Sequence, residues 1–84
     1  MEDYKIKVLE SMEDEMDDVE KYIRMSKVER AEGKHECAAM LRETAREELK
    51  HAKRLWRIYE NHGWEVPEDV KRRYAETEQM VHEM

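Results

Sequence analysis

Apolar residues recur at intervals of three and four along most of the chain, which is the spacing of one face of an α-helix. A first stripe, within about residues 3–32, consists of Val8, Met12, Val19, Tyr22 and Ser26, widened by Leu9, Met16 and Ile23. A second, within about residues 34–61, consists of Ala38, Leu41, Ala45, Ala52, Leu55 and Tyr59. A shorter third stripe, from about residue 67 onward, consists of Val70, Tyr74, Thr77, Val81 and Met84.

Glycine and proline stand between these predicted helices. Gly33 separates the first two, and a short connection of this kind predicts an antiparallel hairpin. Residues 61–63 read as a helix stop, and Pro67, followed by Glu68 and Asp69, suits the first turn of a new helix. The predicted fold class is therefore all-α, a two-helix hairpin with a short C-terminal helix.

The bulk composition narrows the class of protein. The 84 residues suffice for one domain, residues 1–84, and the net charge of −6 argues against a nucleic-acid or anionic-membrane partner. The basic run at 71–73 is short and reads as a solvated helix face. One cysteine allows neither an internal disulfide nor a CxxC metal site, and the N-terminus lacks the apolar segment of a signal peptide. A cytoplasmic location is expected.

A chain of this size buries only a small core and is marginally stable as a monomer. Association with a second copy is a common way to bury more apolar surface. The hairpin buries one face of each helix against the other. The remaining apolar positions of each stripe need a further partner. The helix at 67–84 has no evident partner within a two-helix hairpin. We therefore expect residues 67–84 to act as an oligomerisation helix, and the chain to form a homodimer or a multiple of dimers.

Three polar residues lie on or beside the apolar stripes. Glu48 and His51 are three apart and so share one helix face, and Glu15 lies between apolar residues of the first stripe. Residues equally far from the turn at Gly33 lie at the same height, which places Glu15 opposite Glu48. Burying two carboxylates and an imidazole is unfavourable without a partner, and a divalent cation is one that uses all three.

A two-fold axis would double this set to four Glu and two His, the ligand set of ferritin-like di-iron bundles. The alternative also stands, because a Glu-x-x-His pattern arises readily by chance in a chain with 22 acidic residues. Under that alternative the chain is a structural helical oligomer, in which Glu48 and His51 pair with lysine or arginine.

The residues from about 11 to 57 resemble the rubrerythrin branch of the ferritin-like superfamily. The resemblance rests on Glu15, Tyr22, the Glu32-Gly33 turn and the stretch TAREELKHAKR at residues 44–54. It implies that Glu15 and His51 are terminal ligands, that Glu48 bridges two metals, and that Tyr22 hydrogen-bonds a ligand carboxylate. It implies two iron ions per dimer, with manganese or zinc as substitutes.

The chain also departs from that family. It lacks the second helix pair and the CxxC pairs of a rubredoxin domain, which implies a homodimeric four-helix bundle and an external electron donor. Half-length encapsulated ferritins are the other relative to consider, although no encapsulin-targeting tail is evident. Asp18 is unusual, and it is either an additional carboxylate ligand or a solvated acid.

The expected function is oxidation of ferrous iron, or reduction of peroxide or oxygen, at a di-iron site between two copies. A non-catalytic protein that binds or delivers iron would use the same ligands. The sequence does not separate the two, because both need the same coordination chemistry.

Overall fold

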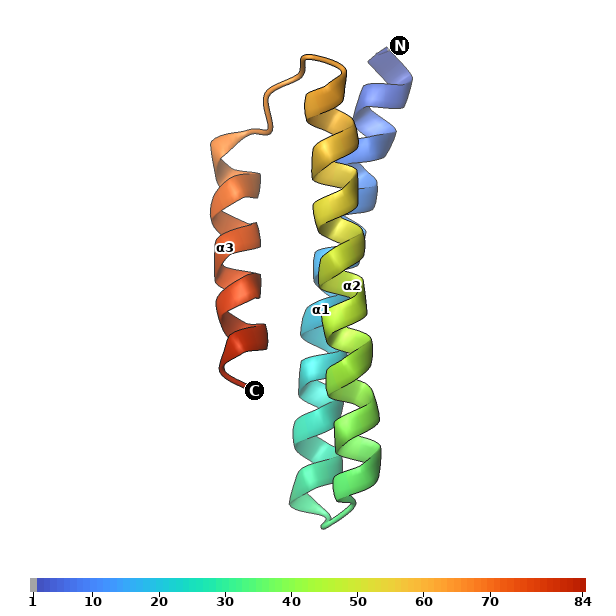
Figure 1. Cartoon of the computed structure of the whole chain (residues 1–84), viewed down its shortest axis with the longest axis vertical. Helices are drawn as coiled ribbons and strands as arrows, with labels where there is room; N and C mark the ends of the chain where they lie inside the picture. The colour runs from blue at the N-terminus through green and yellow to red at the C-terminus, as the bar shows by residue number, and fades with distance from the viewer. Residues whose placement is uncertain (1) are drawn as a thin grey trace.

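The computed structural model describes residues 2–84, and all regular structure in that range is helical. Helix α1 runs over Glu2–Ala31, α2 over His35–Asn61 and α3 over Glu68–His82. These bounds lie within a residue or two of the predicted ones. Figure 1 shows α1 and α2 side by side as an antiparallel hairpin, with α3 along one side. None of these helices is long and apolar enough to cross a membrane.

The hairpin turn depends on Gly33, whose φ of 78° lies in the left-handed region. Side chains other than glycine are strained there, because Cβ approaches the backbone carbonyl. The turn is closed by backbone hydrogen bonds: the N–H of Gly33 donates to the carbonyl of Arg30 at 3.0 Å, and the N–H of Lys34 donates to that of Glu29 at 2.9 Å. The turn thereby sets the register between α1 and α2.

In the core between α1 and α2, large side chains of α1 pack against small side chains of α2. Met12, Met16 and Val19 of α1 are fully buried, and they meet a row of fully buried alanines on α2, which are Ala38, Ala45 and Ala52. Small residues allow the helix backbones to approach closely, and methionine fills the irregular space between them. The predicted hairpin is therefore confirmed, and so are most positions of its stripes; Leu9, Tyr22, Leu41 and Leu55, at the edges, are only half-buried.

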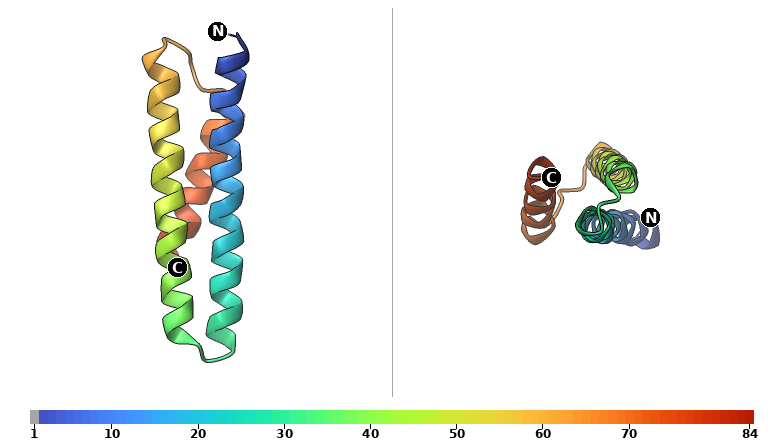
Figure 2. Two further views of the ribbon diagram at one scale, coloured as in Figure 1. Left: turned by 90° about the vertical axis from the view of Figure 1, so that its right-hand side faces the viewer. Right: turned by 90° about the horizontal axis from the view of Figure 1, so that it is seen from below.

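Helix α3 packs along the hairpin of its own chain, as both views in Figure 2 show. Val70, Tyr74, Thr77 and Val81 are buried, and the ring of Tyr74 meets that of Trp56 edge to face at 5.2 Å. The apolar stripe of α3 is therefore covered by the hairpin of the same chain, and not by a second copy as its sequence suggested. A role for residues 67–84 in joining copies stays a prediction.

An ion pair joins α3 to α1 at the surface. The guanidinium of Arg73 pairs with Asp17 and lies 3.7 Å from Glu20. The hydrogen bond that Arg73 donates to Asp17 is the main cause of a raised Arg73 pKa, and the charges of neighbouring carboxylates add to it. The expectation that the whole run 71–73 is a solvated face is therefore wrong for Arg73, which links α3 to α1.

Candidate metal centre

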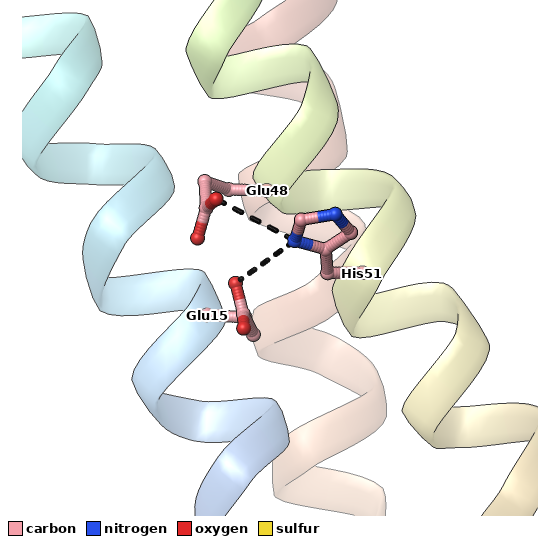
Figure 3. Close-up of side chains that lie close together, drawn as sticks. All are labelled: Glu15, Glu48 and His51. Carbon is pink, nitrogen blue, oxygen red and sulfur yellow. Dashed lines mark ion pairs between the residues drawn. The ribbon is translucent and has the colours of Figure 1, made fainter.

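Two helices place Glu15, Glu48 and His51 around one point (Figure 3). Glu48 and His51 come from successive turns of α2, and Glu15 reaches across from α1 at the same height. One ligand atom from each residue lies within 4.8 Å of the others. The Nδ1 atom of His51 lies 3.5 Å from Oε1 of Glu48 and 3.7 Å from Oε2 of Glu15. The juxtaposition expected from the hairpin register is therefore present.

The triad sits at the boundary between core and solvent. The side chains of Glu48, Glu15 and His51 are 19%, 26% and 45% exposed, respectively. The residues next to them in sequence, Met16 and Ala52, are fully buried and close the inner side. In Figure 3 the ribbon of α3 passes behind the triad, so the triad opens on the hairpin face that α3 leaves uncovered.

The negative charge of Glu15 is partly buried and lies close to other carboxylates. Burial, followed by the hydrogen bond and the charge of Glu48 and the charges of Asp18 and Asp14, raises its pKa from 4.5 to about 7. Its Oε2 atom is buried and, within residues 2–84, has no hydrogen-bond partner. The contact with His51 at 3.7 Å is too long to be a hydrogen bond.

A divalent cation fits this arrangement. Two carboxylates and an imidazole are the donor set that suits iron, manganese or zinc, and a cation between them would satisfy the buried oxygen of Glu15. Three protein ligands leave other coordination positions to be filled by solvent, substrate or a second copy. The donor set of this site is thus chemically suited to a divalent cation.

The two other candidates, Asp18 and Tyr22, lie on α1 after Glu15. Asp18 lies 3.5 Å from Lys21 and is 42% exposed, and its charge contributes to the raised pKa of Glu15. Tyr22 packs against the cluster of Val19, Ile23, Ala45 and Val81, and the ammonium of Lys21 lies 4.7 Å from its ring centroid. Neither belongs to the group of converging ligand atoms. Their roles as ligand and hydrogen-bond partner stay predictions.

Sequence reasoning missed Arg73, which positions α3 relative to the site. The ion pair joins residues 56 apart in sequence, and no local pattern marks it. It also missed the buried oxygen of Glu29, which lies on α1 one turn before the hairpin and has no hydrogen-bond partner within residues 2–84. No further group of three metal-ligating side chains converges in the described part of the chain.

The structure is thus a helical hairpin that carries a carboxylate–imidazole group able to hold a metal ion. The model of the rubrerythrin family matches residues 8–84, and the chain belongs to that family. The match extends beyond the residues 11–57 on which the resemblance rested, and it includes α3. No curated protein and no solved structure gives a match.

Proposed function

We propose that two copies of the chain join through the hairpin face that carries Glu15, Glu48 and His51, and that the paired site holds two iron ions. The observation that carries this proposal is the buried, unpartnered oxygen of Glu15 beside two further ligand atoms. A two-fold axis would bring together four Glu and two His, which is the ligand set of ferritin-like di-iron bundles.

Exposed apolar side chains on the same face support the joining of copies there. By helical periodicity, Met40 lies three turns before His51 on that face, and Ile58 lies two turns after it. Their exposures are 58% and 38%, which is high for large apolar residues. A second copy on this face would bury both, together with the open side of His51, and thereby enlarge a small core.

The three ligand residues differ in burial, and we assign their roles accordingly. Glu48 is the most buried of the three ligands, and we assign it the bridging role, with Glu15 and His51 as terminal ligands. Bound iron would supply one-electron chemistry between its ferrous and ferric states. The carboxylates would offset its charge, and the apolar residues beneath them would exclude water from the inner side.

The activity that this site supports is oxidation of ferrous iron, reduction of peroxide or oxygen, or both. Reduction of peroxide to water consumes two electrons and two protons, so repeated turnover needs an external electron donor. A non-catalytic role in iron binding or delivery is the second candidate. A third, a metal-free structural oligomer, has the observed pairs of His51 with Glu15 and Glu48 in its favour.

Thermal melting tests the metal site directly. Ferrous iron, added anaerobically at about a hundredfold excess over Kd, should raise the Tm of the wild type on the order of 10 °C. Glu48→Ala should lose most of this rise. Glu47→Ala is the matched control, because Glu47 is an exposed neighbour on the same helix. Equal rises in wild type and Glu48→Ala would refute the assignment.

Two further measurements separate the candidates. Sedimentation should show a dimer or a multiple of dimers, and a folded monomer at micromolar concentration would contradict the shared site. Stopped-flow oxidation of ferrous iron, with and without peroxide, separates catalysis from delivery. Iron that binds but undergoes no faster oxidation than free iron would favour the delivery role.

A further inference from the structure

Two stripes of opposite charge run along the hairpin, each about half a turn around its helix from the triad. The basic stripe on α2 consists of Arg42, Arg46, Lys50, Lys53 and Arg57. The acidic stripe on α1 consists of Asp3, Glu10, Glu13 and Asp17, with the apolar Ile6 between the first two. Spacings of three and four keep each set on one helix face; the acidic set spans about 21 Å along its helix and the basic set about 22 Å. The hairpin thus carries two charged surfaces of similar length.

The basic stripe borders a groove between α2 and α3. The groove has a volume of about 470 Å³, and Arg46, Lys50 and Lys53 line it opposite Glu78. Its apolar lining is formed by Leu49, Tyr74 and Val81. Arg46 also faces the exposed Glu43 at 3.5 Å, and exposed pairs of this kind contribute little. In a chain with a net charge of −6, this groove concentrates positive charge beside an apolar surface.

The acidic stripe offers the complementary surface. Asp17 is already paired with Arg73 of its own chain, and the half-buried Glu13 lies near the same guanidinium, whereas Asp3 and Glu10 are exposed toward solvent. Ile6 lies between these two acids on the same face and is 49% exposed. An apolar side chain flanked by carboxylates matches an apolar groove flanked by cationic side chains.

We propose that the acidic stripe of one copy docks on the basic stripe of a second copy, with Ile6 directed to the groove between α2 and α3. A second copy is the occupant that these surfaces fit, because each copy carries both of them. The two surfaces have opposite charge and similar length. The contact is heterologous, joining different surfaces of the two copies, so it links molecules into a ring or a chain. It leaves the triad face free and does not depend on metal binding.

A charge-exchange experiment with the purified full chain tests this contact. The wild type should sediment as species larger than a dimer at about 20 mM salt, and these should dissociate at about 500 mM salt, where the Debye length is a few ångströms. R46E/K50E makes both surfaces acidic, and D3K/E10K makes both basic. Each variant alone should raise the Kd of the larger species about a hundredfold or more, because like charges then face each other.

Mixing the two variants is the decisive step. An equimolar mixture should restore the larger species, since the basic stripe of D3K/E10K faces the acidic groove of R46E/K50E. R30E/K34E and E32K/E36K carry the same changes in net charge at the hairpin turn, and they should assemble like the wild type. Failure of the mixture to assemble, or no salt effect on the wild type, would overturn the proposal. Loss of assembly in R46E/K50E but not in D3K/E10K would also overturn it, because the groove would then have another occupant.

Discussion

Replacement of Glu15 by glutamine should stabilise the metal-free protein at alkaline pH and have little effect at acid pH. Burial and the adjacent Glu48 raise the pKa of Glu15 from 4.5 to about 7, so the folded state binds its proton more tightly than the unfolded state does. The resulting stabilisation is fully present below pH 4.5 and is lost as the pH rises through 7. Glutamine stays neutral throughout and so avoids that loss.

The size of the effect follows from the pKa shift. At 1.36 kcal/mol per pH unit, the shift corresponds to an upper limit of about 3 kcal/mol between pH 4.5 and pH 8. Because the side chain is 26% exposed, solvent screens part of the interaction, and we expect about 1–2 kcal/mol. Glu15→Gln should therefore exceed the wild type in free energy of unfolding by that amount at pH 8.

Urea denaturation in the presence of a chelator, followed by circular dichroism at pH 5, 6, 7 and 8, measures this difference. Glu47→Gln serves as the control, since it makes the same chemical change at an exposed position. Parallel pH profiles for wild type and Glu15→Gln, or a destabilised variant at pH 8, would show that Glu15 is not an uncompensated carboxylate.

Other substitutions test the metal ligands, the packing of α3 on the hairpin and the turn at Gly33. His51→Ala should weaken iron binding less than Glu48→Ala does, because water can replace a terminal ligand; titration followed by elemental analysis measures both. Tyr74→Ala should lower the free energy of unfolding by about 3 kcal/mol, since the ring is buried against α2, whereas Tyr4→Ala at a half-exposed ring should lower it by less than about 1 kcal/mol. An effect of Tyr74→Ala as small as that of Tyr4→Ala would mean that α3 is not seated on the hairpin in solution. Gly33→Ala should destabilise by about 1–2 kcal/mol because of its φ of 78°, and asparagine at this position should recover part of the loss. Chemical denaturation checks this, and an unchanged midpoint in Gly33→Ala would contradict it.

The helices and the hairpin could be read from the sequence because both are local properties. Apolar spacing defines which face of each helix is buried, and glycine supplies the left-handed residue at which the chain reverses. The approach of Glu15 to Glu48 followed from these two facts, since an antiparallel hairpin with a short turn has only one register. The composition of the triad was therefore predictable, and so was its height in the hairpin.

The environment of the triad was not predictable in the same way. The apolar stripes show which residues face inward, but they do not show how far a side chain at the edge of a stripe is exposed. His51, at 45% exposure, lies nearer to solvent than the neighbouring Glu48, because it sits further around the helix from α1. The raised pKa of Glu15 depends on that partial burial and on the distance to Glu48, and only the packed hairpin sets both.

Three helices, their inward faces and the pairing of a carboxylate on α1 with a Glu-x-x-His on α2 follow from local patterns in the sequence. The side of the hairpin on which α3 lies does not follow from them, because it depends on contacts between residues far apart in the chain. A hairpin has two open sides, and the local pattern of α3 fits either one. Buried contacts of Tyr74 and the ion pair between Arg73 and Asp17, residues far apart in the chain, select the side away from the triad. That choice leaves the face with Glu15, Glu48 and His51 open, because a single helix covers only one side of the hairpin.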